Sequence, residues 1–171
     1  ELDLRWLTAL DDTRLARIAD DAASADMTII CSTWLQHEPG ETLADARRVA
    51  RALRSGLIRM HLAPVLEGAR ARLGERWPPI VTHARTVLAR EAAAARDEGI
   101  RIGLEDHQDF GSEELLAFAA EAGDNVGIVL DTGNPFAVGE DPVAFTERVA
   151  SRLFHVHLKD YRAQATTEGY R

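Results

Sequence analysis

Three short apolar runs in the second half of the chain each end in a side chain that can bind a metal ion or transfer a proton. Each run has four or five residues and is rich in aliphatic side chains, as is typical of a buried strand, and the runs lead into Glu105, Asp131 and His157. Consecutive members of this set lie 26 residues apart, a step that fits one strand followed by one helix. The spacing therefore predicts three successive parallel strands whose carboxyl ends bring the three side chains together.

The rest of the chain alternates in the same way between apolar runs and segments with helical spacing. We expect strands at residues 1–7, 27–32, 57–62, 100–104, 126–130 and 153–156, and helices at 12–25, 43–55, 80–96, 113–122 and 142–152. The expected N-caps of three of these helices are Thr42, Ser112 and Asp141. Strict alternation predicts a parallel sheet with helices outside it. We expect residues 1–171 to form a single domain, because no break in composition divides them.

An open doubly wound sheet and a closed barrel both fit this alternation. The barrel is favoured because the three candidate ligands lie at the ends of successive strands rather than at one switch point. A complete barrel of eight strand–helix units needs roughly 250 residues, so a chain of 171 residues would form an incomplete one.

The one long irregular passage lies at residues 63–79. It contains Pro64, Gly68, Gly74 and the pair Pro78-Pro79. A loop of this length inside a compact domain is more often functional than idle. Because loops that follow strands form the ligand-binding face of a barrel, we expect this passage to cover the pocket.

Composition limits the class of partner. The net charge of −8 argues against nucleic acid, whose partners usually present a basic face, and no apolar run is long enough to cross a bilayer. The single cysteine, Cys31, excludes an intramolecular disulfide and fits a reducing, cytoplasmic compartment. These features give no indication of a nucleic-acid or membrane partner.

Polar residues follow the run that ends at Glu105. A carboxylate directly beside a buried run needs a partner, which favours a functional role for Glu105. His107 lies on the same face by strand alternation and either contacts substrate or bonds to a carbonyl group. Asp109 is expected to cap a turn or to lie exposed.

The two later runs carry similar groups of polar residues. Asn134 follows Asp131 after a glycine and either points back toward the site or completes an Asx turn. His155, His157 and Lys159 alternate, so they face the same way. We expect His157 at the metal ion, His155 deeper behind it, and Lys159 at the rim near substrate oxygens. The alternative for Lys159 is a salt bridge to a carboxylate at the rim.

Three segments of the sequence resemble the xylose isomerase-like (β/α)8 barrel family. They are residues 103–110, 130–142 and 155–161, and the most specific phrases are Asp-Thr-Gly-Asn at 131–134 and His-Val-His-Leu-Lys-Asp at 155–160. The family includes sugar-phosphate isomerases and epimerases, ketose 3-epimerases, inosose dehydratases and the type IV apurinic endonucleases. The resemblance covers most of the chain, from about the second to the seventh barrel strand.

The resemblance implies a metal centre. In the family, the metal ion is held by a Glu on the fifth strand, an Asp on the sixth, a His on the seventh and a Glu on the eighth. The first three positions match Glu105, Asp131 and His157, whereas the fourth ligand is expected beyond Arg171. The sequence starts at Glu1 rather than Met, so either it is part of a longer protein or the centre lacks one ligand. Asn134 replaces a histidine of many relatives, which counts against the endonuclease branch.

The implied activity is that of a divalent-metal-dependent isomerase or epimerase, which acts on a sugar or polyol derivative through an enediolate-type proton transfer. Mixed oxygen and nitrogen ligands suit Mn²⁺, Mg²⁺ or Co²⁺, with Zn²⁺ as an alternative. The expected roles are catalytic for Glu105 and Lys159, metal-binding for Glu105, Asp131 and His157, and substrate-binding for His107, Asn134 and His155.

Two other functions remain open. The same ligands would serve a dehydratase of a keto-inositol or a related compound, because expulsion of a β-hydroxyl starts from the same proton transfer. A non-catalytic barrel fragment, or a ligand-binding subunit with a degenerate metal site, belongs to a different class. A homo-oligomer is also left open.

Overall fold

A computed structural model describes residues 1–65, 69–160, 162, 164–167 and 169–170 of the chain. Its centre is a parallel sheet in which six strands pair in the order of the sequence. The strands are β1 (Leu2–Asp3), β2 (Cys31–Trp34), β3 (Leu57–His61), β4 (Arg101–Glu105), β5 (Val126–Asp131) and β6 (Leu153–His157). Within the described residues β1 and β6 do not pair, so the sheet is unclosed, as an incomplete barrel requires.

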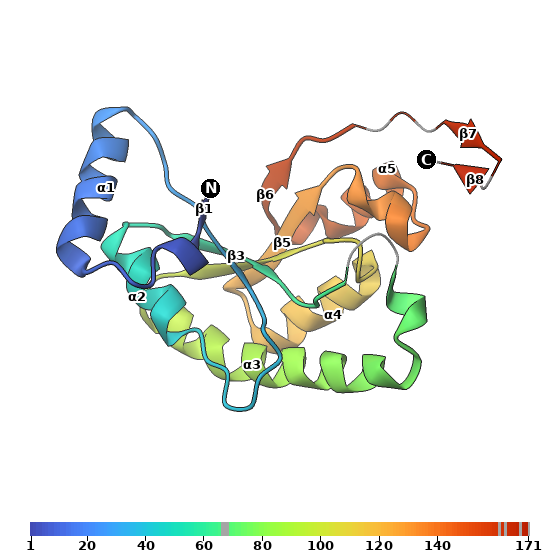
Figure 1. Ribbon diagram of the computed structural model, residues 1–171, viewed down its shortest axis with the longest axis horizontal. Helices are drawn as coiled ribbons and strands as arrows, with labels where there is room; N and C mark the ends of the chain where they lie inside the picture. The colour runs from blue at the N-terminus through green and yellow to red at the C-terminus, as the bar shows by residue number, and fades with distance from the viewer. Residues whose placement is uncertain (66–68, 161, 163, 168, 171) are drawn as a thin grey trace.

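Helices connect the strands, because consecutive parallel strands need a crossover. They are α1 (Asp12–Ser24), α2 (Ala44–Ala52), α3 (Trp77–Asp97), α4 (Ser112–Ala122) and α5 (Pro142–Val149). Shorter 3-10 helices occur at η1 (Leu4–Trp6), η2 (Ala69–Arg72), η3 (Gly74–Arg76), η4 (Asn134–Val138) and η5 (Ala150–Arg152). A small antiparallel pair, β7 (Ala165–Thr166) and β8 (Gly169–Tyr170), follows β6. Figure 1 shows α2, α3 and α4 lying along one side of the curved sheet.

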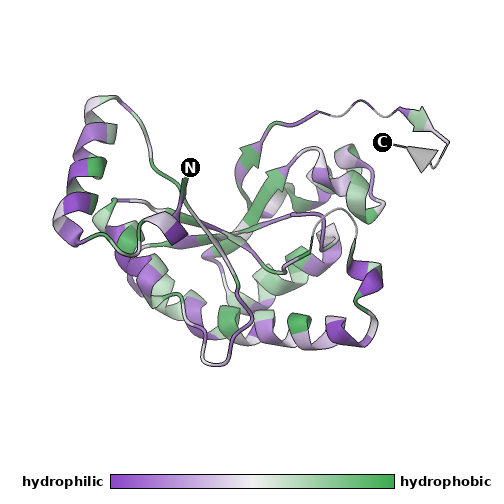
Figure 2. Ribbon diagram, viewed as in Figure 1, coloured by the Kyte–Doolittle hydropathy of each residue, from purple (hydrophilic) through white to green (hydrophobic). Residues whose placement is uncertain are grey.

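The main hydrophobic core lies between the sheet and these helices. Alternate strand residues face it, and all are almost completely buried: Ile58, Met60, Ile102, Leu104, Ile128 and Leu130. The helices contribute residues such as Val87, Leu88 and Leu115. Figure 2 shows the corresponding apolar stretch of β5 and the polar residues that recur along the helices. Burial of this apolar face is the main driving force for the fold.

The other face of the strands carries a different set of side chains. Because neighbouring residues point to opposite faces, Arg59 and His61 alternate with the core residues of β3. Strand register places Asp131 beside His157 and places Glu105 beside Val129. Polar groups at the carboxyl ends of β3 to β6 therefore share one edge of the sheet.

A close approach of strands explains one glycine on this inner face. A Cβ atom at Gly103 would lie 2.5 Å from Cγ2 of Val129 on the neighbouring strand. Because real Cβ atoms do not approach a neighbour so closely, the side chain of Val129 occupies the space that a larger residue at 103 would need.

The structure corrects the expected first two strands. Only Leu2–Asp3 of the predicted strand at 1–7 is extended, because the Asp3 side chain accepts a hydrogen bond from Arg5 N and starts η1. The second strand spans Cys31–Trp34 rather than 27–32. Its pairing with β3, from Cys31 beside Ile58 onward, decides where it begins.

The irregular passage at 63–79 is also shorter than predicted. Two 3-10 helices, η2 and η3, occupy part of it, and residues 66–68 lie outside the described residues. Helix α3 begins at Trp77 rather than Ile80 and includes two prolines in its first turn. Proline is tolerated there because the first N–H groups of a helix have no partner within the helix.

One of the three expected N-caps is confirmed. Asp141 caps α5 through hydrogen bonds from Val143 N and Ala144 N. The N-cap of α2 is Leu43 rather than Thr42, and that of α4 is Gly111 rather than Ser112. The Ser112 hydroxyl instead donates to Oε2 of Glu140 at 2.6 Å.

No helix in the described part of the chain is both long enough and apolar enough to cross a membrane.

Candidate metal centre

The three strand-end residues singled out by their spacing meet at one point. Glu105, Asp131 and His157 each offer a ligand atom, and these atoms all lie within 4.8 Å of one another. Nδ1 of His157 lies 3.4 Å from Oε1 of Glu105. The expected convergence is therefore present, and its cause is the parallel register of β4, β5 and β6. That the three side chains bind a metal ion stays a prediction.

Glu105 lies at the centre of this group and is only 1% exposed. Its Oε2 atom contacts both the Arg59 guanidinium and Nε2 of His61. Burial raises the pKa of the carboxyl, but the hydrogen bond with His61 and the nearby charges of His61 and Arg59 outweigh it, so the pKa falls to about 2. Glu105 is therefore a carboxylate at neutral pH, the form that a metal ligand needs.

Asp131 is held by its backbone as well as by its side chain. Its N–H donates to Oδ1 of Asp106 at 2.6 Å, and its own Oδ1 accepts a hydrogen bond from Gly133 N at 3.3 Å. Its other oxygen, Oδ2, lies 2.8 Å from Nζ of Lys159. These contacts fix both the position and the orientation of the Asp131 carboxylate.

Lys159 forms a salt bridge to the carboxylate of Asp131 at the rim. This contact is the one expected as the alternative to a substrate contact. Besides pairing with Asp131, its Nζ donates to Oδ1 of Asn134 at 2.9 Å. Asn134 also accepts a hydrogen bond from Nε2 of Gln108 at 3.1 Å. Asn134 therefore does point back toward the site, where it connects Lys159 with the loop after β4. The catalytic role of Lys159 and the substrate contact of Asn134 stay predictions.

The two histidines of β6 lie next to each other. The ring centroids of His155 and His157 are 5.1 Å apart, and the rings meet edge to face. Both belong to a second group of three potential ligands with Glu1, whose Oε1 lies 3.0 Å from Nε2 of His157. Burial and the neighbouring His157 lower the pKa of His155. The expected position of His155 deeper behind His157 and its contact with substrate stay predictions.

His107 packs against aromatic rings, and among the described residues it makes no hydrogen bond to a carbonyl group. It stacks on His61 at a centroid distance of 3.8 Å and meets Trp34 edge to face at 5.1 Å. Burial, followed by the charge of His61, lowers the pKa of His107 to about 4. The imidazole is therefore neutral at pH 7 and can exchange hydrogen bonds with uncharged hydroxyl groups.

Sequence reasoning missed Arg59 and assigned no role to His61, beyond noting that this histidine follows a buried run that can lead to the pocket. Both lie on β3 and reach Glu105, and His61 is 2% exposed. His61 had no ligand-like neighbours in sequence, because its partners lie on the next strand. The available signal was the alternation of Arg59 and His61 with apolar residues of a buried strand.

Two further carboxyl groups are buried beside the centre. Burial raises the pKa of Asp106 to about 9, although the hydrogen bond from Asp131 N opposes it. Asp109 is completely buried, so the expectation that it might lie exposed is wrong. Its Oδ1 accepts a hydrogen bond from Phe110 N at 2.9 Å, and burial raises its pKa to about 7.

The donor atoms of the centre fit a divalent cation. Two carboxylates and one imidazole, without a thiolate, are a ligand set that suits Mn²⁺, Mg²⁺ or Co²⁺ and can also hold Zn²⁺. Each carboxylate already faces a cationic side chain, Arg59 at Glu105 and Lys159 at Asp131. These two cationic side chains therefore balance the charge of the two carboxylates.

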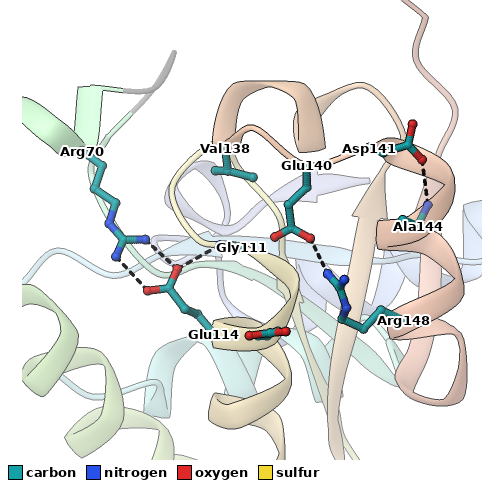
Figure 3. A pocket seen from close by; sticks show the side chains of 9 residues that line it. Arg70, Gly111, Glu114, Val138, Glu140, Asp141, Ala144 and Arg148 are labelled. Carbon is teal, nitrogen blue, oxygen red and sulfur yellow. Dashed lines mark hydrogen bonds and ion pairs between the residues drawn. The ribbon is translucent and has the colours of Figure 1, made fainter.

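A separate hollow of about 560 Å³ lies between the beginnings of α4 and α5. Figure 3 shows two ion pairs along its wall, Arg70 with Glu114 and Arg148 with Glu140. Because these charged groups satisfy one another, nothing in their arrangement points to a ligand. The hollow shares no lining residue with the candidate metal centre.

The fold and the polar rim together define a parallel α/β barrel protein with a candidate metal centre at the carboxyl ends of its strands. The model of the family described as "xylose isomerase-like TIM barrel" matches residues 7–170. The chain belongs to this family.

Relatives with similar sequences include two proteins of stated function. An inosose dehydratase of Clostridium beijerinckii is 31% identical over 106 residues, which are 58% of this chain and 34% of that protein. The rhizopine catabolism protein MocC of Rhizobium meliloti is 37% identical over 76 residues, which are 40% of this chain and 23% of that protein. The chain thus matches less than half the length of these relatives.

Solved structures with the same fold include sugar epimerases. A D-psicose 3-epimerase superposes with a TM-score of 0.73 over 98% of this chain and 65% of its own, at 16% identity. A D-tagatose 3-epimerase-like protein gives a TM-score of 0.67 over 88% of this chain and 62% of its own, at 21% identity. At these identities the likeness concerns the fold alone.

Proposed function

We propose that the protein is a divalent-metal-dependent isomerase or epimerase that acts on a sugar or polyol derivative. The observation that carries the proposal is the convergence of Glu105, Asp131 and His157 within 4.8 Å at the ends of adjacent strands. Membership of the xylose isomerase-like family supports it, since solved relatives of this fold include sugar epimerases. The proposed substrate class is a small-molecule carbohydrate.

A bound divalent ion would polarise a substrate carbonyl and stabilise the negative charge that develops on its oxygen when the neighbouring carbon loses a proton. Glu105, Asp131 and His157 would hold it. The low pKa of Glu105 keeps this side chain ionised, which favours its role as a ligand over that of a general base near pH 7. Both roles are assigned to Glu105, and the first has the stronger support.

The remaining residues would bind and orient the substrate. Lys159 is tethered by Asp131 and Asn134, so its ammonium group has a fixed position at the rim, where it can donate to a substrate oxygen. Neutral His107 can exchange hydrogen bonds with hydroxyl groups. His155 meets His157 edge to face and would help to keep that imidazole in place.

A dehydratase is the second candidate. The specific observation in its favour is the match to inosose dehydratases, of which a second example, from Lacticaseibacillus casei, is 30% identical over 90 residues. Proton abstraction beside a carbonyl begins both reactions, and loss of a β-hydroxyl completes the dehydration. Incubation of ketoses and keto-inositols in D₂O, followed by NMR, separates the two. Deuterium incorporation with retention of all hydroxyls identifies an epimerase, whereas an unsaturated product identifies a dehydratase.

The metal centre itself is tested by elemental analysis after loading with Mn²⁺. We expect Asp131→Ala and His157→Ala each to abolish metal binding, because each removes one of three ligands from a shared site. Asp97→Ala is the matched control, since this aspartate is exposed at the end of α3. Metal content equal to that of the unaltered protein in both site variants would contradict the proposal. The cytoplasmic location stays a prediction, and the homo-oligomer stays open.

A further inference from the structure

The two carboxylate oxygens of Glu105 face different groups. Oε1 lies toward His157, at 3.4 Å from Nδ1, on the side of the proposed metal centre. Oε2 points the other way and contacts His61 and Arg59 of β3. Each oxygen of Glu105 thus has its own nitrogen-bearing neighbours, so the carboxylate lies between two positions that a cation could occupy.

The second side of Glu105 carries its own set of potential ligands. His61, Glu105 and His107 each offer an atom, and these atoms lie within 4.8 Å of one another. His61 is 2% exposed, and neither its Nδ1 nor that of His107 has a hydrogen-bond partner among the described residues. Unpartnered buried nitrogens of this kind suit a cation.

The guanidinium group of Arg59 contacts Oε2 of Glu105, the oxygen that also contacts His61. Besides Oε2 of Glu105, Arg59 contacts the hydroxyl of Ser32 at 2.7 Å and Oε2 of Glu1 at 3.5 Å. Its side chain is 14% exposed. Arg59 comes from the same strand as His61, two residues earlier, so both point to the same face of the sheet.

We propose that the Arg59 guanidinium takes the place of a second metal ion beside Glu105, and that the centre therefore binds a single divalent ion. The inference rests on the proposed metal centre and adds its stoichiometry. Removal of the guanidinium opens a second site, made by His61, Glu105 and His107, which shares Glu105 with the first.

Two properties of arginine explain how its guanidinium group excludes a second metal ion. The guanidinium stays protonated throughout the physiological range, so it cannot become a ligand itself. A divalent ion at Oε2 of Glu105 would also lie beside this fixed positive charge, at a distance where repulsion between buried charges is large. Lysine at the same position would retain the charge, whereas methionine would retain much of the volume without it.

The test measures Mn²⁺ bound per chain, by elemental analysis after removal of free ion and by titration calorimetry. We expect one ion in the unaltered protein even at a hundredfold excess, two in Arg59→Met, and one in Arg59→Lys. The double variant Arg59→Met/His61→Ala should return to one. Electron paramagnetic resonance gives an independent signature, because two Mn²⁺ ions that share a carboxylate show exchange coupling.

The outcomes distinguish failure of this inference from failure of the proposed metal centre. Two ions in the unaltered protein would overturn the inference without any variant. One ion in both the unaltered protein and a folded Arg59→Met would overturn it as well, while the metal centre stands. No ion in the unaltered protein would overturn the proposed centre and this inference together. Arg59→Gln provides a second uncharged variant, and circular dichroism confirms which variants fold.

Discussion

Replacement of Asp109 by Asn should make the stability of the protein less dependent on pH. Asp109 is completely buried, and one of its oxygens, Oδ2, has no hydrogen-bond partner among the described residues. Its other oxygen accepts from Phe110 N at 2.9 Å. An asparagine oxygen can accept the same bond, so Asp109→Asn removes the ionisable group while it keeps the shape and the main contact.

The size of the effect follows from the pKa. Burial raises the pKa of Asp109 from 3.8 to about 7. Between these two values the unfolded chain loses the proton and the folded chain keeps it, so the folded state becomes less stable as the pH rises. A difference of about 3 pH units at 1.36 kcal/mol each amounts to about 4 kcal/mol, fully expressed above pH 7. Below pH 4 both states are protonated and the effect vanishes.

The assay is urea unfolding followed by circular dichroism, at pH values from 4 to 8. We expect Asp109→Asn and the unaltered protein to have similar free energies of unfolding at pH 4, and the variant to be more stable by up to about 4 kcal/mol at pH 8. Asp97→Asn is the matched control, because its side chain is exposed. A difference between Asp109→Asn and the unaltered protein that does not change with pH would refute the reasoning.

Two further changes test the packing of the sheet and of the helices. Gly103→Ala should cost about 1–3 kcal/mol in urea unfolding, because its Cβ would lie 2.5 Å from Val129 Cγ2, and the added Val129→Ala should recover part of that loss. Equal stability of Gly103→Ala and the unaltered protein would show that the strands can separate. Arg47→Met should cost about 3 kcal/mol by the same assay, because it removes a buried partner of Glu91, and Arg47→Met/Glu91→Leu should be nearly neutral. A double variant no more stable than Arg47→Met would contradict this account of the pair.

The sequence was sufficient to predict which strand ends meet. Glu105, Asp131 and His157 occupy equivalent positions in successive strand–helix units, and parallel pairing brings equivalent positions to one edge. The apolar runs predicted β3 to β6 for the same reason, because buried parallel strands read as short continuous apolar segments.

The contacts across strands could not be predicted in this way. Arg59 and His61 are 46 and 44 positions before Glu105, and only the pairing of β3 with β4 makes them neighbours. The burial of Asp109 likewise depends on how the loop after β4 packs. No local pattern distinguishes such a carboxyl from an exposed one in a polar segment.

Local hydrogen bonds explain the errors at the chain start and at the helix caps. Alternating polar and apolar residues predicted a strand at 1–7, but the Asp3 side chain competes for the backbone and turns it into η1. Ser112 has the right residue type for a cap, yet its hydroxyl is taken by Glu140, which is 28 residues away in sequence.

The hydrogen bond from the Asp131 backbone to Asp106 has a consequence for how the centre behaves as a unit. It fastens the end of β5 to the residue that directly follows Glu105, at 2.6 Å. This hydrogen bond therefore adds to the pairing of β4 with β5 in holding the two strand ends, and with them the two carboxylates, at a fixed spacing. A cation that binds at this rim would meet two carboxylates whose spacing is already set. Little conformational entropy would then be lost on binding.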